Sequence, residues 1–374
     1  MDRMSVSRRK FAMRQELTST LNARLERRCH DEWIDSQKGL NVVVGLVSEK
    51  NPSMRHIKVI QNFHGELDVS RFLDALDGSE VQTVAFVGVN MDKNYSVKLA
   101  KAVSDLNSAI TCLQLSRIVP EGLPSICPAI VQSRALKELR LTFDHDLSYA
   151  DVQMLVESVG DNRTLEIFKL YCVDLRERGA SIMAQAIRKS ASLKDIRLTN
   201  CHLSEITCLT NAIREKQYTR VDFSMNRISN TAALATLWGC PTIQYLSMSQ
   251  NEIGSEEILE ENRETYKNYF DLLATNKTLT NLHLDMNPMS PDFVEYLQRA
   301  LEKNTTLTRL GLLSLTVTRE AAKRIRYLVS LNAAGRGRVQ RDFPAALLPF
   351  LLSRVSKEPD LLYGLMIQTP HVWL

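Results

Sequence analysis

Long apolar stretches are missing from the sequence. No run of 18 apolar residues occurs in the 374-residue chain, and no short apolar core follows its basic start. A membrane-spanning helix needs about 20 apolar residues, so we expect no transmembrane segment. A secretory leader needs a short apolar core, so we also expect no export. We therefore predict a soluble protein of the cytoplasm.

Cysteines are few and follow no pattern typical of disulfides or zinc sites. There are seven, an odd number, and no pair has C-x-x-C spacing. We interpret them as reduced thiols packed as small apolar groups, as is usual inside cells. Glycosylation sequons therefore carry little weight in this chain. They begin at Asn94, Asn162, Asn276 and Asn304.

Catalytic signatures are missing as well. The sequence contains no P-loop, no G-x-S-x-G, no H-E-x-x-H and no paired zinc cysteines. The seven histidines are dispersed, and the net charge of +4 is too small to indicate nucleic-acid binding by itself. We therefore expect no enzyme, no cofactor, no metal site and no small-molecule substrate.

What the sequence does contain is a repeated leucine pattern. Two consecutive copies fit L-x-x-L-x-L-x-x-(N/C)-x-L, and their first leucines, Leu165 and Leu193, are 28 residues apart. Residues 176–190 between them carry apolar side chains at helical spacing. One strand plus one helix cannot bury its own apolar face, so the copies must stack. The two copies are Leu165, Phe168, Leu170, Val173 and Leu175, then Leu193, Ile196, Leu198, Cys201 and Leu203.

Ten strand starts of this kind can be placed, on average about 28 residues apart. They are Met54, Val81, Ile110, Leu136, Leu165, Leu193, Tyr218, Ile243, Leu279 and Leu307. The steps into and out of Tyr218 are 25 residues, which predicts short helices between residues 204 and 240. The step from Ile243 to Leu279 is 36 residues. Its extra length falls in residues 254–267, which we expect either to lengthen a helix or to protrude as a loop.

This pattern, joined to helical segments such as residues 180–193 and 293–307, resembles the ribonuclease-inhibitor class of leucine-rich repeat proteins over residues 54–331. The resemblance implies an α/β solenoid shaped as a horseshoe, with a concave parallel β-sheet, convex helices and about ten repeats. We expect a basic helical cap over residues 1–53, the repeat array over residues 54–331 and a helical cap over residues 332–374. The class includes a GTPase-activating protein of nuclear transport, actin-capping tropomodulins and sensing domains of immune receptors. This chain has neither the receptors' nucleotide-binding domain nor the activator's acidic tail.

The first 30 residues are strongly basic, with eight arginine or lysine side chains against three carboxylates. Apolar residues at steps near four predict an amphipathic helix over residues 5–30. One interpretation is a cap on the first repeat, and another is a basic arm for anionic lipid or nucleic acid. An organelle transit peptide is a third interpretation, against which the carboxylates argue.

The ninth position of the pattern has a structural task. A buried side chain there must hydrogen-bond the turning backbone after each strand, because the sheet no longer satisfies it. Asn226, Asn251 and Asn287 can do this, and Cys201 can do so weakly.

Candidate binding residues occupy the third, fifth and seventh strand positions, which point onto the concave face. Position five gives Arg140, Lys169 and Arg197 in three consecutive repeats. They could form ion pairs with nearby acids, worth about 0–1 kcal/mol each, or a docking stripe for an acidic partner with Tyr171 as its aromatic anchor. A second cluster, in the later repeats, could bind a polar partner and consists of Tyr245, Asn281, His283 and Asp285. The candidates are Glu138, Arg140, Lys169, Tyr171, Asp195, Arg197, Arg220, Asp222, Tyr245, His283 and Asp285.

We therefore predict a non-enzymatic intracellular scaffold that binds a protein along the concave sheet, between the fourth and ninth repeats. Two alternatives stay open at this point. One is a regulator of a small GTPase or of actin. The other is a membrane- or nucleic-acid-associated factor that acts through the basic N-terminus.

Overall fold

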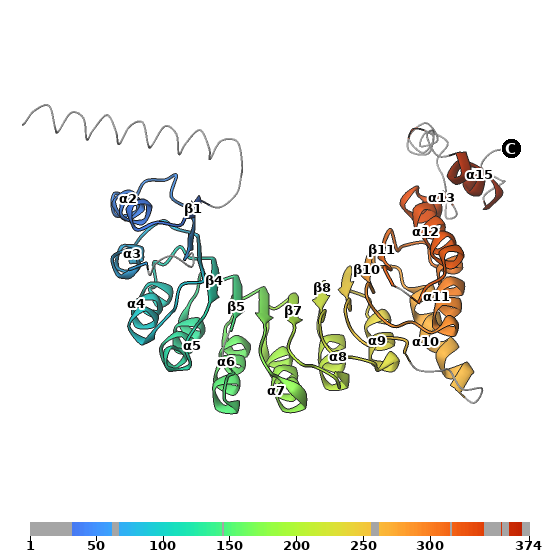
Figure 1. Ribbon diagram of the computed structural model, residues 1–374, viewed down its shortest axis with the longest axis horizontal. Helices are drawn as coiled ribbons and strands as arrows, with labels where there is room; N and C mark the ends of the chain where they lie inside the picture. Colours follow the sequence, from blue (N-terminus) through green and yellow to red (C-terminus); the bar gives the residue numbers. More distant parts are fainter. Residues whose placement is uncertain are drawn as a thin grey trace, which may run out of the picture. The chain divides into compact units, whose positions relative to one another are not determined.

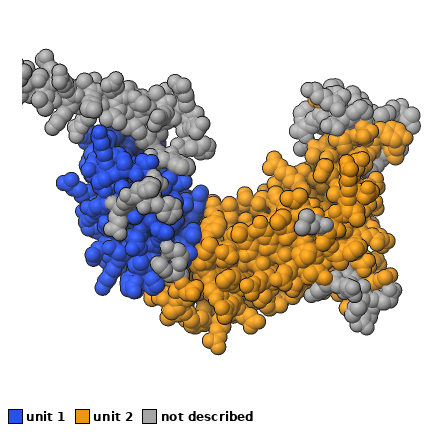
Figure 2. Space-filling view, in the orientation of Figure 1, with its two compact units in different colours: residues 1–145 blue, residues 146–374 orange. Residues whose placement is uncertain are grey.

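Strands and helices alternate along the chain in the computed structural model (Figure 1). The structure describes residues 32–61, 67–143, 146–255, 262–314, 316–339, 353 and 359–368. Contacts divide the chain into two compact units, residues 1–145 and residues 146–374 (Figure 2). The predicted basic helix over residues 5–30 lies outside the described residues. Within the described part, no helix is both long and apolar enough to cross a membrane.

In the first unit, neighbouring strands pair in parallel and in sequence order. The strands are β1 (Glu32–Ile34), β2 (His56–Ile60), β3 (Thr83–Val87), β4 (Cys112–Ser116) and β5 (Glu138–Thr142). The helices are α2 (Gln37–Ser48), α3 (Ser70–Leu76), α4 (Lys93–Ser104), η1 (Pro120–Gly122) and α5 (Leu123–Gln132). All of these helices lie on one side of the strands (Figure 1).

The second unit repeats the same plan, again with parallel neighbours in sequence order. Its strands are β6 (Ile167–Tyr171), β7 (Asp195–Thr199), β8 (Arg220–Asp222), β9 (Tyr245–Ser247), β10 (Asn281–His283) and β11 (Arg309–Gly311). Its helices are α6 (Tyr149–Asp161), α7 (Arg176–Lys189), α8 (Thr207–Arg214), α9 (Thr231–Trp238), α10 (Arg263–Thr275), α11 (Pro291–Lys303), α12 (Arg319–Ala333), α13 (Arg336–Val339) and α15 (Pro359–Gln368).

The leucine positions form the core, as predicted. In β5, Leu139 and Leu141 are buried between partly exposed neighbours, which is the alternation of a strand with one covered face. Each fully buried leucine contributes about 1.5–3 kcal/mol relative to an exposed one. The stacked rungs of the second unit, Leu170, Leu198, Phe223 and Leu284, are all completely buried. Strand–helix units of this pattern and period form a leucine-rich repeat solenoid.

Buried asparagines close the turns after the strands, which confirms the prediction for the ninth position. The Oδ1 atom of Asn226 accepts hydrogen bonds from the backbone N–H groups of Cys201 and Leu203 in the preceding repeat. Its Nδ2 atom donates to the carbonyl oxygens of Leu198 and Phe223. Equivalent bonds link neighbouring repeats at the next two asparagines, Asn251 and Asn287.

A second set of buried asparagines lies at the carboxyl ends of the helices, and its role was not predicted from the sequence. The Nδ2 atom of Asn304 donates to the carbonyl oxygens of Leu273 and Asn276, while Asn332 donates to that of Asn304. The sequon asparagines Asn162, Asn276 and Asn304 belong to this position and are buried. Their side chains hold the turns before the strands and are not accessible for glycosylation in the folded chain.

Three details of the structure bear on the expected plan of the chain. A strand, β1, lies inside the predicted helical cap over residues 1–53 and pairs with β2. Its three residues are too few to show an alternating pattern, so the sequence did not reveal it. In the predicted insertion, α10 has 13 residues, as many as α11, so the extra length does not extend this helix. The short helices predicted between residues 204 and 240 are present as α8 and α9, with eight residues each.

The C-terminal segment, predicted as a helical cap over residues 332–374, contains a buried arginine, Arg336. Helix α12 continues to Ala333, and Arg336 opens the short helix α13. The Arg336 guanidinium is buried and donates to the Oδ1 atom of Asn332 and to the carbonyl oxygens of Leu301 and Asn304. The carbonyl groups at the end of α11 lack helical partners, and a cation satisfies them well.

Candidate functional site

The helices of each unit leave one face of the strands uncovered, which we call the open face (Figure 1). In the first unit, this face carries the candidate residues Glu138 and Arg140 on β5. The Nε atom of Arg140 donates to the Oε1 atom of Glu138 over 2.7 Å, and both side chains are partly exposed. This arginine is therefore part of an ion pair within its own strand.

Lys169 on β6 does not fit the predicted role of a surface cation. Only 7% of its surface is exposed. The sequence places it on the open face, but it does not show how closely neighbours such as Arg197, its register partner on β7, cover it. A buried lysine cannot act as an exposed cation of a docking stripe. Tyr171, the predicted aromatic anchor, is partly exposed at the end of β6.

On β7, Asp195 and Arg197 form a bidentate ion pair. Arg197 donates from Nε to the Oδ1 atom of Asp195 over 3.0 Å and from Nη2 to its Oδ2 atom over 2.8 Å. Burial lowers the pKa of the Arg197 guanidinium, but the hydrogen bonds and charge of Asp195 outweigh this effect and raise the pKa above its ordinary value. Two parallel bonds of this kind fix the guanidinium plane.

Arg220 on β8 stacks on an aromatic ring instead of pairing closely with a carboxylate. Its guanidinium carbon lies 3.7 Å from the centroid of the Tyr245 ring on β9. Its Nε atom is 4.0 Å from the Oδ2 atom of Asp195, which is too far for a hydrogen bond. This Nε atom is buried and has no hydrogen-bond partner among the described residues. The ring therefore holds the cation while its donors stay unfilled.

The contacts continue from Tyr245 onto β10. The Tyr245 and His283 rings lie 5.2 Å apart between centroids, and the Nδ1 atom of His283 is 3.7 Å from the Oδ2 atom of Asp285. The Oδ1 atom of Asp285 accepts a hydrogen bond of 2.8 Å from the backbone N–H of Leu313. Gly311 makes room for this arrangement, since a Cβ atom there would stand 2.0 Å from the Asp285 carboxylate.

These contacts join side chains from β7 through β10 into one chain, which we call the open-face network. Its members are Asp195, Arg197, Arg220, Tyr245, His283 and Asp285. All six are predicted binding residues, but the sequence does not show that they are in contact. Gly311 could not be predicted, because a glycine in a strand gives no sign of which side chain uses its space.

Asp222 lies beside this network in a small cluster of hydroxyl groups. Its Oδ1 atom accepts hydrogen bonds from the backbone N–H and the hydroxyl of Ser224. The Ser224 hydroxyl also lies 2.7 Å from the hydroxyl of Ser247 on β9. The Asp222 carboxylate is thus engaged by donors of its own chain.

The arrangement is suited to binding. The open-face network offers guanidinium, imidazole, aromatic and carboxylate groups on parallel strands. Among the described residues, no group of three or more histidine, cysteine, aspartate or glutamate side chains is placed to hold a metal ion.

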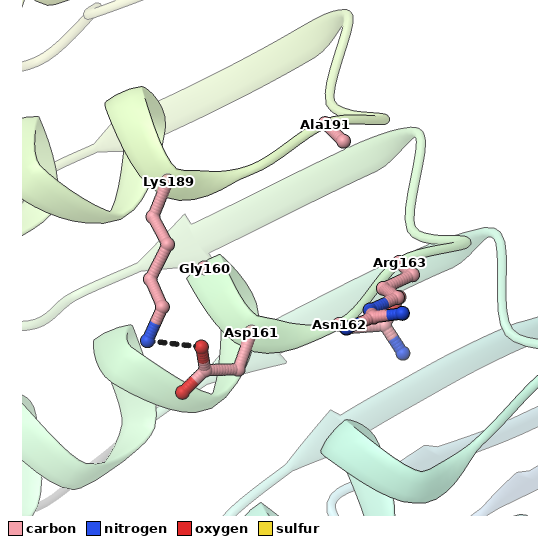
Figure 3. A pocket seen from close by; sticks show the side chains of 6 residues that line it. All are labelled: Gly160, Asp161, Asn162, Arg163, Lys189 and Ala191. Atoms are coloured by element: carbon pink, nitrogen blue, oxygen red, sulfur yellow. Dashed lines mark ion pairs between the residues drawn. The ribbon is translucent and has the colours of Figure 1, made fainter.

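A depression of about 480 Å³ lies elsewhere, where helices α6 and α7 end (Figure 3). Lys189 and Asp161 form an ion pair across it, and Arg163 and Asn162 extend along its other side (Figure 3). The Asn162 side chain is one of the buried turn asparagines. None of the residues that line this depression is among the predicted binding residues.

The repeat pattern, the parallel strands and the buried leucine rungs define the chain as a leucine-rich repeat protein. No model of a known protein family matches it. It is similar to the human NACHT, LRR and PYD domains-containing protein 13, with 25% identity over 209 residues. This match covers 54% of the chain but only 19% of that protein, so the chain spans about a fifth of its relative's length.

Solved structures resemble it more distantly. The actin-binding site 2 of leiomodin-1 has 13% identity and a TM-score of 0.23, covering 52% of this chain and 79% of that one. The TLR13–ssRNA13 complex has 16% identity and a TM-score of 0.41, and the match covers 70% of this chain and 42% of that one. At these TM-scores, neither likeness carries an argument about function.

Proposed function

We propose that the protein is a non-enzymatic, protein-binding scaffold of the ribonuclease-inhibitor class and that its partner docks on the open face of β7–β10. The observation that carries this proposal is the open-face network, whose six side chains touch one another in sequence across four strands. The cysteine pattern of the sequence supports a cytoplasmic location.

Prior ordering of these side chains favours binding. Immobilising a flexible interface side chain costs about 0.5–1.5 kcal/mol at association. Here Arg197 is held by two hydrogen bonds and Arg220 by the Tyr245 ring before any partner arrives. Arginine and tyrosine are also the residue types enriched among those that contribute most to protein interfaces.

The charges of the face favour an acidic partner. Each of the carboxylates Asp195, Asp222 and Asp285 already accepts a hydrogen bond from this chain. The Arg220 guanidinium, in contrast, forms no hydrogen bond with the described residues. The unfilled donors of Arg220 are cationic, and they attract a partner that supplies carboxylates.

The proposal is tested by purifying tagged full-length protein from the source cell and quantifying the proteins that copurify. The double variant Tyr245→Asp, His283→Asp should lose the specific partners. The control Tyr149→Asp, Asn268→Asp places the same two carboxylates on exposed helix positions of α6 and α10 and should retain them. Equal partner sets for both variants, or capture of nuclease-sensitive nucleic acid alone, would contradict the proposal.

A further inference from the structure

The open face of the second unit presents an arginine on β8 with an unfilled donor, and the carboxyl ends of its strands carry exposed apolar side chains. The arginine is Arg220, whose buried Nε atom has no partner in the described part of the chain. The Arg220 side chain lies over the Tyr245 ring and is 37% exposed, so a partner can approach its terminal N–H groups. A planar carboxylate is the acceptor that matches such a donor fork.

The apolar row lies at the carboxyl ends of the strands, where the chain turns away from the sheet. Its members are Met225 after β8, Met286 after β10 and Leu313 after β11, with exposed fractions of 48%, 56% and 70%. The backbone N–H of Met286 donates to the backbone carbonyl oxygen of Leu313. These two residues therefore lie in adjacent, hydrogen-bonded repeats. We call these three residues the apolar rim.

The methionines of the apolar rim are not required by the backbone. Both have left-handed conformations, with φ of 60° at Met225 and at Met286. In other repeats the same left-handed turn position holds side chains of several kinds, so the backbone demands no particular one. They are Gly88, Arg117, Cys172, Asn200 and Gln250. The left-handed backbone costs methionine about 1–2 kcal/mol, and 48% of Met225 and 56% of Met286 remain exposed. Flexible thioethers at such positions are suited to contact with apolar groups of a partner.

We propose that the open face binds an extended protein segment that places a carboxylate on Arg220 and a large apolar side chain on Met286 and Leu313. This inference rests on the proposed function and specifies the chemistry of the partner. The carboxylate fills the guanidinium donors that this chain leaves open. The apolar side chain covers thioether and leucine surface that is otherwise exposed.

The repeat geometry sets the spacing between the two groups. Arg220 stands at the third position of its repeat and Met286 at the eighth position of a repeat two strands away. Five strand residues correspond to about 16 Å and two strand spacings to about 10 Å, which gives a diagonal of about 19 Å. An extended segment covers that distance in about six residues. The acidic and apolar residues of the partner should therefore be about six positions apart.

The test uses a random library of displayed 12-residue peptides, selected on the full-length protein. We expect enriched peptides to carry aspartate or glutamate and, about six residues away, leucine, methionine or phenylalanine. Arg220→Gln should weaken binding of the synthesised peptide about tenfold or more, as expected for a charge-assisted hydrogen bond. Replacing the peptide's acidic residue by its amide should weaken binding to the wild-type protein by a similar factor. The same replacement should change binding to the Arg220→Gln variant little, because that variant has already lost the guanidinium. Fluorescence anisotropy of the labelled peptide measures each dissociation constant.

Matched controls separate these effects from general changes of charge or exposure. Arg214→Gln removes a cation from the exposed end of α8, and Leu106→Ser removes an exposed leucine after α4. Neither should change peptide affinity, whereas Met286→Ser with Leu313→Ser should remove the preference for the apolar residue. Thermal unfolding confirms that each variant is folded.

Several outcomes would overturn the inference. One is a selection that enriches basic peptides. Another is a selection on the wild-type protein that enriches the same peptides as a selection on the Arg220→Gln variant. A third is an acidic peptide that binds the wild-type protein and the variant equally. If one of these occurs while Tyr245→Asp, His283→Asp still loses the cellular partners, the proposed function stands and only the carboxylate-and-rim inference is wrong. If the cellular partners are also unchanged, the proposed function is wrong too.

Discussion

The side chain of Asn226 hydrogen-bonds the backbone N–H of Cys201, 25 residues earlier in the chain, over 2.9 Å. The same carboxamide also binds the N–H of Leu203 and the carbonyl oxygens of Leu198 and Phe223. One buried side chain thus joins two neighbouring repeats at the point where both leave the sheet.

Asn226→Ala should therefore lower the free energy of unfolding by about 2–4 kcal/mol, because it leaves buried backbone donors and acceptors without partners. Urea unfolding measured by circular dichroism provides the test. Asn268→Ala, on the exposed side of α10, is the control and should change stability by less than about 0.5 kcal/mol. Equal midpoints for the two variants would contradict the task assigned to Asn226.

Leu170→Asp should unfold the neighbouring repeats. Leu170 is completely buried, and an unpaired carboxylate at this position has neither water nor a cation to solvate it. Truncation to alanine alone costs about 2–5 kcal/mol at such sites, and the charge adds to that cost. The control Ile167→Asp is on the open face of the same strand and partly exposed, so its loss should be smaller. A thermal transition unchanged in Leu170→Asp would contradict the stacked core.

Arg336→Met should loosen the end of the array without unfolding its centre. The substitution removes the donors that satisfy the carbonyl oxygens of Leu301 and Asn304, at a cost of about 3 kcal/mol. Hydrogen exchange should accelerate in α11 and α12 and stay unchanged in α7. Arg326→Met removes an exposed arginine of α12 and should leave exchange as in the wild type. If both variants exchange alike, the buried guanidinium does not hold this end.

Thiol labelling should discriminate sharply between Cys172 and Cys201. Cys172 is exposed, whereas burial raises the pKa of Cys201 to about 12. Only the thiolate reacts, and at pH 8 it makes up about one part in 10,000 of a thiol with that pKa. Maleimide labelling followed by mass spectrometry should therefore modify Cys172 first, and Cys201 only after unfolding. Rapid labelling of native Cys201 would contradict its burial.

The raised pKa of Cys201 also affects the stability of the fold at alkaline pH. A thiol whose pKa is raised by folding stabilises the native state fully below its unfolded pKa of about 8.5. That contribution is lost as pH rises from there toward about 12. The alkaline decline in unfolding free energy should accordingly be shallower in Cys201→Ala than in the wild type.

The leucine pattern determined the solenoid without help from the structure. Its period of about 28 residues forces one strand and one helix into each repeat, and the apolar face of each unit requires a neighbour. Asn226, Asn251 and Asn287 could be assigned in advance, because the ninth position follows a strand and its backbone needs a hydrogen-bonding side chain. The burial of Lys169 could not be predicted, since it depends on how side chains of other repeats pack around it.

The sequence by itself determined which residues share the open face, because side chains alternate along a strand and repeats place equal positions side by side. Only the tertiary structure decided which of them are paired. It showed Arg197 bound to Asp195, and Arg220 stacked on Tyr245 with its donors unfilled. The reason is physical: a repeat pattern sets the direction of a side chain, whereas its partner depends on its rotamer and, as for Arg220 and Tyr245, on a neighbouring repeat.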